Sequence, residues 1–215
     1  MNIIIISATP FEAQPLQEKV AENGLKNIYF HISGVGILQS CFSIQKIITE
    51  QKPDFIIQIG IAGSYDKQRF LGDVAVVEEE FLGSCGVEEN GEWKDIFDLK
   101  FGNKNQFPFE KSGLKNPFLE TYNLLHLPEV KAVTVDEITT AQSRIQQLKN
   151  KYNPSLESME GASLHYCASQ YNIPFLQMRG ISNYTGERNK TNWKIKDAIQ
   201  NVCEKGFELL RKLNG

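Results

Sequence analysis

The sequence predicts a single α/β domain whose central sheet is covered by helices on both faces. Short, fully apolar runs rich in β-branched residues, such as Ile3–Ile6, alternate with segments of helical periodicity. The chain has 215 residues, of which 41% are hydrophobic, enough for one sizeable core but hardly for a second domain. We therefore expect residues 1–215 to form one domain.

Six runs of apolar and β-branched residues predict strands. In order they are Asn2–Ala8, Ile28–Ile32, Asp54–Ile59, Asp73–Phe81, Val130–Val135 and Phe175–Ile181. We expect the third strand to end in a Gly-rich turn at Gly60–Gly63, and Asn90-Gly91 predicts a further turn. The fourth strand begins apolar and becomes acidic at Glu78–Glu80.

Five segments predict helices, expected at 10–23, 37–49, 140–151, 159–170 and 193–213. Pro10 suits the first turn of a helix, where its missing N–H costs nothing, and Gly24 is a good C-terminal stop. Residues 95–115 are rich in Phe, Lys, Asn and Pro without a clean period, and they predict an irregular segment.

Composition argues against several classes of function. The formal net charge is -3, and no run of Lys and Arg is interleaved with aromatic residues. We therefore expect a small polar molecule as partner and no nucleic acid. The four cysteines and three histidines are scattered, without the spacing of a zinc site or a disulfide framework. No metal centre is expected.

The apolar N-terminus is too short to carry the chain into or across a membrane. A secretory apolar region needs about 7–15 residues and a membrane span about 20. Ile3–Ile6 falls short of both and is soon followed by Glu12. The run instead predicts a buried strand, and we expect a cytoplasmic protein without a membrane partner.

Three segments stand where expected strands end, namely Ser7–Glu12, Gly60–Ser64 and Ser182–Gly186. In open α/β sheets, ligands bind at the carboxyl ends of the strands. We therefore expect these three segments to converge on one site.

Glu12, Glu160 and Asn183 are the polar candidates, and each also has an ordinary structural interpretation. Glu12 lies in a first helical turn, where the helix dipole favours acidic residues. Glu160 stands at a helix start, where Glu157 competes for the same role. Asn183 follows a strand and can cap the turn into Gly186. Each residue taken alone leaves both interpretations open.

Five blocks give these residues a shared context: Ser7-Ala8-Thr9-Pro10-Phe11-Glu12, Gly60-Ile61-Ala62-Gly63, Leu71-Gly72-Asp73-Val74, Ser158-Met159-Glu160-Gly161-Ala162 and Arg179-Gly180-Ile181-Ser182-Asn183. Their order and spacing resemble the nucleoside phosphorylase and nucleosidase superfamily, which includes methylthioadenosine/S-adenosylhomocysteine nucleosidases. Within it, the chain most resembles futalosine hydrolases, nucleosidases of menaquinone biosynthesis. The resemblance implies a mixed central β-sheet flanked by helices, a homodimer or higher homo-oligomer, and no metal or organic cofactor.

The resemblance also implies roles for individual residues. Glu12 matches the carboxylate that activates the attacking water, and Asn183 matches the residue that contacts N7 of the purine. Glu160 matches the acid that binds the ribose 2′- and 3′-hydroxyls, with Met159 packed against the sugar.

Further substrate-binding residues are expected around the base and the 5′ substituent. Gly63, Thr134 and Val135, near strand ends, are candidates for the base pocket. The 5′ substituent of futalosine is an aromatic carboxylate, which requires a cation and a flat apolar wall. Arg188 and Trp193 can supply these, although a surface Arg and a core Trp are the ordinary alternatives.

Two departures from related sequences shape the expected reaction. Adenine-specific relatives carry Asp in place of Asn183, and Asp can supply a proton to N7. A neutral amide can donate a hydrogen bond there but no proton, which suits a 6-oxopurine. Phosphorylases carry Arg and Ser where this chain has Gln58 and Ile61, which cannot form charge-assisted bonds to phosphate. The nearby Lys67 and Arg69 are the residues that could overturn this second argument.

The resulting expectation is hydrolysis of futalosine to hypoxanthine and dehypoxanthinyl futalosine. The alternatives are a methylthioadenosine/S-adenosylhomocysteine or broader purine nucleosidase, a nucleoside phosphorylase, and a non-catalytic nucleoside-binding module. Release of adenine would favour the first, and stimulation by phosphate the second. The presence of Glu12, Glu160 and Asn183 together argues against a non-catalytic module.

Overall fold

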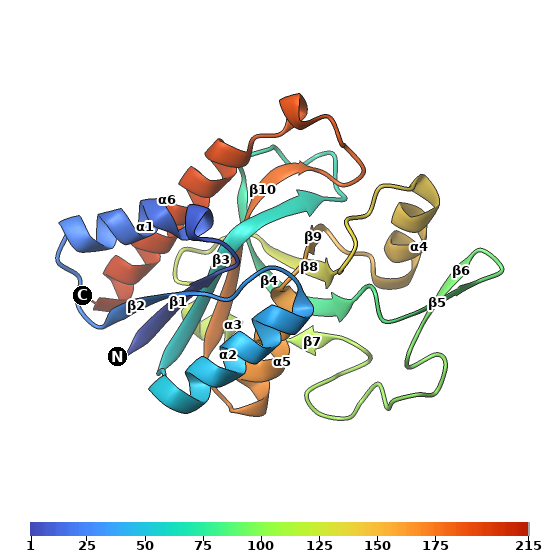
Figure 1. Cartoon of the computed structure of the whole chain (residues 1–215), viewed down its shortest axis with the longest axis horizontal. Helices are drawn as coiled ribbons and strands as arrows, with labels where there is room; N and C mark the ends of the chain where they lie inside the picture. The colour runs from blue at the N-terminus through green and yellow to red at the C-terminus, as the bar shows by residue number, and fades with distance from the viewer. Residues whose placement is uncertain (215) are drawn as a thin grey trace.

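The computed structural model describes residues 1–214 and has a mixed eight-stranded sheet at its centre (Figure 1). The strands are β1 Ile3–Ser7, β2 Ile28–Ile32, β3 Phe55–Ser64, β4 Val74–Leu82, β7 Leu114–Lys115, β8 Glu129–Thr134, β9 Leu156–Ser158 and β10 Phe175–Tyr184. They follow the order β10-β4-β8-β9-β3-β1-β2, with β7 beside β4. Because β10 also pairs with β3, the path from β10 through β4, β8 and β9 to β3 closes on itself. The predicted α/β class with a mixed sheet is confirmed.

Helices cover the sheet on both faces, as predicted. They are α1 Pro10–Glu22, α2 Ile37–Gln51, α3 Leu119–Tyr122, α4 Gln142–Tyr152, α5 Gly161–Gln170 and α6 Ile195–Asn214, with a 3₁₀ turn at Lys190–Asn192. Ile3 and Ile5 pack in the core cluster that contains α1 and α6, whereas Ile4 and Ile6 pack in the cluster with α2 and α5. Burial on both sides explains why the first strand shows no alternation of apolar and polar residues.

The strand β3 is longer than expected, and the predicted turn at Gly60–Gly63 is wrong. These residues stay in the strand because they pair with β10, where Gly60 lies opposite Arg179 and Gly63 opposite Asn183. Gly63 also pairs with Glu157 of β9 on its other side. The strand β10 likewise continues past the predicted end at Ile181 to Tyr184.

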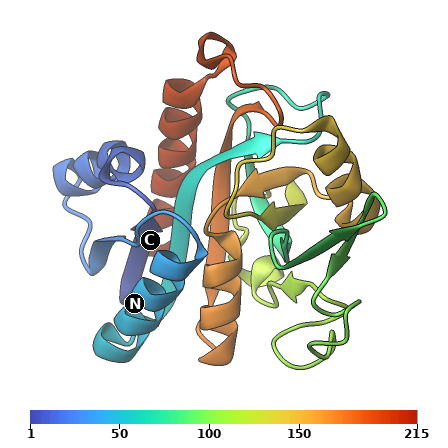
Figure 2. The same ribbon diagram turned by 45° about the vertical axis from the view of Figure 1, so that its right-hand side comes forward.

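The chain between β4 and β8 is the least regular part of the structure. Asn90-Gly91 does form the turn of a hairpin, between β5 Gly86–Glu89 and β6 Glu92–Asp95. Residues 95–115 form turns that end in the short β7, so the prediction of an irregular segment is confirmed. Figures 1 and 2 place this segment and the hairpin at the end of the molecule away from α1 and α6. Within residues 1–214, no helix has the length and apolar character of a membrane span.

Candidate active site

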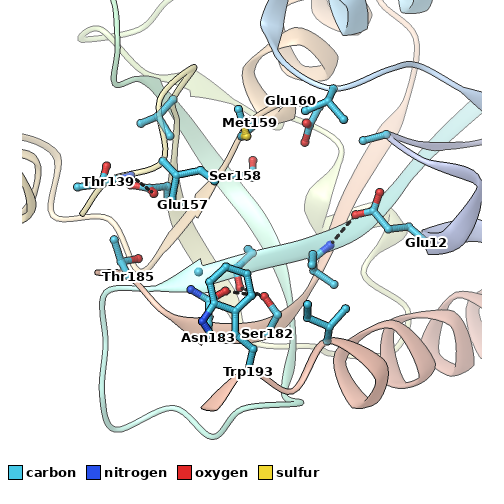
Figure 3. A pocket seen from close by; sticks show the side chains of 18 of the residues that line it. Glu12, Thr139, Glu157, Ser158, Met159, Glu160, Ser182, Asn183, Thr185 and Trp193 are labelled. Atoms are coloured by element: carbon cyan, nitrogen blue, oxygen red, sulfur yellow. Dashed lines mark hydrogen bonds between the residues drawn. The ribbon is translucent and has the colours of Figure 1, made fainter. Parts of the chain in front are cut away.

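A cavity of about 390 Å³ opens where β1, β3, β8, β9 and β10 end. Its wall contains residues from all three segments that the sequence predicts to converge, Ser7–Glu12, Gly60–Ser64 and Ser182–Gly186. Figure 3 shows side chains from these segments around one space. The predicted site residues that line it are Glu12, Gly63, Val135, Met159, Glu160, Asn183 and Trp193.

Glu12 lies at one side of the cavity, in the first turn of α1. Its Oε2 accepts hydrogen bonds from the backbone N–H and the hydroxyl of Thr9, at 3.1 and 2.9 Å, and its Oε1 accepts one from the N–H of Ile61 at 3.2 Å. The bond from the Thr9 N–H is half of a capping box, in which the Thr9 side chain accepts from the N–H of Glu12, so Glu12 has a structural role as well. A carboxylate has about four acceptor positions, which leaves one for a water molecule in the cavity.

Glu160 is the N-cap of α5 and is buried beside a buried cation. Its Oε1 accepts a hydrogen bond from the N–H of Gly36 at 3.2 Å, and its Oε2 lies 3.7 Å from Nη1 of Arg179. Burial raises the pKa of Glu160, whereas the positive charge of Arg179 opposes that rise. Arg179, which is 1% exposed, also donates to Oε1 of Gln58 at 2.9 Å. The Glu160 carboxylate at the cavity wall is therefore held in place by the N–H of Gly36 and by Arg179.

Asn183 lies in β10, on the other side of the cavity from Glu12 (Figure 3). Its Nδ2 donates to the carbonyl of Tyr184 at 3.1 Å, and its Oδ1 accepts from the hydroxyl of Ser182 at 2.7 Å. Because a carbonyl oxygen can only accept, the nitrogen must be the atom that faces Tyr184. The second amide hydrogen of Nδ2 then remains for a ligand, which is the donor that contact with purine N7 requires.

Glu157, in β9, is a third buried carboxylate of the cavity and lies on the same side as Asn183 (Figure 3). It lines the cavity, and its Oε1 accepts a hydrogen bond from the N–H of Thr139 at 3.1 Å. The hydroxyl of Tyr65 donates to its Oε2. Nearby, the hydroxyl of Thr185 is buried in the cavity wall and has no hydrogen-bond partner among residues 1–214.

Two predicted substrate-binding residues do not line the cavity. Thr134 is fully buried behind it, where its hydroxyl donates to Glu80 at 2.9 Å and accepts from the N–H of Ala162 at 2.8 Å. Arg188 is exposed, and its guanidinium stands 5.5 Å from the ring centre of Trp193. Trp193 itself lines the cavity and donates from Nε1 to the carbonyl of Glu187 at 3.0 Å.

The cations that could have supplied a phosphate site also lie outside the cavity wall. Lys67 is exposed, and Nε of Arg69 lies 3.9 Å from a carboxylate oxygen of Asp66. Gln58 is buried against Arg179, whereas Ile61 lines the cavity with an aliphatic side chain. In the part of the chain from 1 to 214, no group of three or more His, Cys, Asp or Glu residues is arranged to hold a metal ion.

Sequence reasoning did not assign roles to Arg179, Ser182 and Glu157. Arg179 and Ser182 stand within the block that ends at Asn183, and a charged residue inside an apolar strand was the available signal. Glu157 appeared only as a competitor of Glu160. The register of β9 against β3, which no sequence pattern contains, is what brings it to the cavity.

A family profile described as the phosphorylase superfamily matches residues 32–213. The chain belongs to the phosphorylase superfamily. Membership confirms the resemblance drawn from the five sequence blocks. It also fits the closed path of the sheet and the cavity at the strand ends.

The curated relatives of this chain include proteins of two different names. Futalosine hydrolase of Thermus thermophilus is 25% identical over 221 residues, covering 99% of this chain and 96% of the relative. The 5′-methylthioadenosine/S-adenosylhomocysteine nucleosidase of Halalkalibacterium halodurans is 24% identical, covering 78% and 72%. Both are nucleosidases, which agrees with the prediction of an enzyme of this class.

Solved structures carry the same two names. Futalosine hydrolase of Helicobacter pylori has a TM-score of 0.80 at 17% identity, covering 98% of this chain and 97% of that one. The nucleosidase of Colwellia psychrerythraea, a 5′-methylthioadenosine/S-adenosylhomocysteine nucleosidase in complex with adenine, has a TM-score of 0.80 at 19% identity, covering 100% and 96%. At these identities the likeness establishes the fold.

Proposed function

We propose that this enzyme hydrolyses the N-glycosidic bond of a 6-oxopurine nucleoside, with futalosine as substrate and hypoxanthine and dehypoxanthinyl futalosine as products. That reaction belongs to menaquinone biosynthesis, and we propose a cytoplasmic location for it. The observation that carries the proposal is one cavity with Glu12 and Glu160 on one side and Asn183 on the other (Figure 3).

The proposed mechanism passes through an oxocarbenium-like transition state, as glycoside hydrolysis generally does. The purine leaves with developing negative charge, and the free N–H of Asn183 stabilises that charge at N7. Glu12 accepts the proton of the attacking water at its remaining acceptor position. Glu160 accepts hydrogen bonds from the ribose hydroxyls, and Met159 packs against the sugar.

Hydrolysis is favoured over phosphorolysis by the groups around the expected position of the anion. Gln58 is engaged by Arg179, and Ile61 offers no hydrogen-bond donor from its side chain. Arg179 lies beside this place, but it is fully buried and its guanidinium is paired with Glu160. A phosphate dianion at this place would meet two carboxylates, Glu12 and Glu160, and no uncommitted positive charge.

For the 5′ substituent we propose Trp193 as the flat wall, since it lines the cavity and Arg188 does not.

We also propose a homo-oligomer. Leu38 and Phe42, four residues apart on α2, are 85% and 70% exposed, and the exposed Val35 just before this helix lines the cavity. An apolar surface that continues into a substrate cavity is suited to cover by a second copy of the chain. Sedimentation equilibrium tests this, because a monomer at micromolar concentration would contradict it.

A parallel assay of futalosine, methylthioadenosine and inosine tests the proposed reaction. We expect release of hypoxanthine from futalosine with the highest kcat/KM, and no dependence on phosphate. Release of adenine from methylthioadenosine as the dominant reaction would overturn the choice of base and favour the second relative. Formation of ribose 1-phosphate would overturn hydrolysis.

The substitution Glu12→Gln tests the proposed base. The amide keeps the size of the side chain but cannot take a proton, so we expect kcat to fall by about 10²–10⁴-fold while nucleoside binding persists. Unchanged turnover would mean that another group activates the water. Loss of binding and turnover together, with a lowered melting temperature, would indicate that the capping box with Thr9 is the main role of Glu12.

A further inference from the structure

The mechanism above leaves one buried carboxylate of the cavity without a role. Glu157 is 7% exposed and lines the same wall as Asn183, yet it lies away from Glu12 and Glu160, which act on the sugar (Figure 3). Burying a carboxylate is costly unless it is hydrogen-bonded, and Glu157 has donors in Thr139 and Tyr65. These two donors leave further acceptor positions on the carboxylate oxygens of Glu157 for a ligand in the cavity.

The sheet places Glu157 and Asn183 in one row. Asn183 of β10 is paired with Gly63 of β3, and Gly63 is paired with Glu157 of β9. Two strand spacings separate the outer residues, so their Cα atoms are about 10 Å apart. That span accommodates one purine with a hydrogen bond on each edge.

Gly63, between Asn183 and Glu157, lets polar side chains approach the backbone of this row closely. A Cβ there would stand 3.4 Å from Nδ2 of Asn183 and 3.1 Å from the hydroxyl of Thr185. Without it, the Asn183 amide and the Thr185 hydroxyl can lie close to the backbone between Asn183 and Glu157. A base held at N7 by Asn183 then turns its neighbouring edge, with N1, toward Glu157.

The wall around Glu157 presents an acceptor to that edge. The N–H of Thr139, which could have donated to a ligand, is bonded to Glu157 instead. Burial, and next the negative charge of Glu157, raise the pKa of Tyr65, so its hydroxyl keeps its proton and donates to the carboxylate. What remains for a ligand is a carboxylate oxygen, which can only accept.

We propose that Glu157 determines the base specificity of the enzyme by accepting the N1–H of a 6-oxopurine. In hypoxanthine and guanine N1 carries a hydrogen, whereas in adenine N1 is a bare acceptor. Adenine in the same pose would place two acceptors against each other in a buried site, which rejects it. This assignment rests on the proposed function, since it assumes a purine held by Asn183.

Calorimetric titration with the free bases hypoxanthine and adenine tests the assignment separately from turnover. For the wild-type enzyme, we expect hypoxanthine to bind about 10- to 100-fold more tightly, the range for one hydrogen bond to a charged group. In Glu157→Gln the new amide can donate to N1 of adenine, so the ratio of the two affinities should move toward adenine by at least about tenfold. The ratio of kcat/KM for inosine and adenosine should move in the same direction.

Tyr65→Phe is the matched control. It removes a donor from the same carboxylate but leaves the acceptor, so the preference for hypoxanthine should persist. Equal or tighter binding of adenine by the wild-type enzyme would overturn the assignment without any variant. So would an unchanged ratio in a folded Glu157→Gln. Wild-type enzyme that prefers hypoxanthine but cleaves no purine nucleoside would instead refute the proposed function and leave the base-reading role intact.

Discussion

Replacing Glu80 by Gln should change how the stability of the protein depends on pH. Glu80 lies in β4 and is fully buried; its Oε1 accepts a hydrogen bond from Thr134, and its Oε2 has no partner within residues 1–214. Burial raises its pKa from 4.5 to about 7, although the bond from Thr134 and the charge of Arg179 act in the opposite direction. Gln177 lowers this pKa as well, and the negative charge of Glu160 raises it.

The sign and size of the effect follow from linkage. Because the pKa is higher in the folded state, the folded protein binds the proton more tightly, and stability falls as pH rises from about 4.5 to about 7. Each tenfold change in proton affinity is worth about 1.4 kcal/mol, so the interval from 4.5 to about 7 corresponds to about 3 kcal/mol. The Gln variant cannot ionise and escapes this loss.

Urea denaturation of both proteins at equal concentration, from pH 4.5 to pH 8, measures the effect. The free energy of unfolding of Glu80→Gln minus that of the wild type should increase by about 3 kcal/mol across this range. Glu22→Gln, which removes a carboxylate from the exposed end of α1, controls for the loss of one negative charge. A difference that stays constant with pH would refute the idea that burial controls the ionisation of Glu80.

Three further substitutions test neighbouring contacts. In Gly161→Ala the new Cβ would press on Oε2 of Glu80 and stand 2.5 Å from Nε2 of Gln177. This overpacking should lower the free energy of unfolding by about 1–3 kcal/mol, measured by thermal denaturation. An unchanged melting temperature would contradict it. Arg179→Met leaves Glu160 buried without its cation and should cost about 3–5 kcal/mol in urea, whereas a loss under about 1 kcal/mol would show that the pair is dispensable. In Asn183→Asp the new carboxyl group must be protonated to donate a hydrogen bond to the carbonyl of Tyr184, and it then becomes a proton donor. The kcat/KM for adenosine relative to inosine should therefore rise. A constant ratio would argue against contact with N7.

The parts of the fold that follow from local pattern were predictable. Ile3–Ile6 is buried on both faces, and such a run has few alternatives to a central strand. The three residues of β9 were not predictable, because their strand character comes from pairing with β3 and β8 rather than from their own sequence. Short elements depend on partners that are distant in sequence.

The acidic end of β4 shows the same limit for side chains. Glu78–Glu80 reads as a strand emerging into solvent, yet Glu79 is 8% exposed and Glu80 is fully buried. The register against β8 shifts between Val77 and Glu79, so the alternation of inward and outward residues changes there. A one-residue irregularity redirects a carboxylate into the core, and composition carries no sign of it.

The glycines of β3 explain why the sequence block at Gly60–Gly63 marks the site although it forms no turn. A Cβ at Gly60 would stand 2.6 Å from Nη1 of Arg179 and 3.0 Å from Oε1 of Glu12. Its absence lets a buried cation approach the carboxylate proposed to activate water, while the absence of a Cβ at Gly63 leaves room for the amide of Asn183 and the hydroxyl of Thr185. Each glycine thus lies beside one of the two groups proposed to act on the scissile bond. Close approach of side chains to the backbone, rather than chain reversal, accounts for both positions.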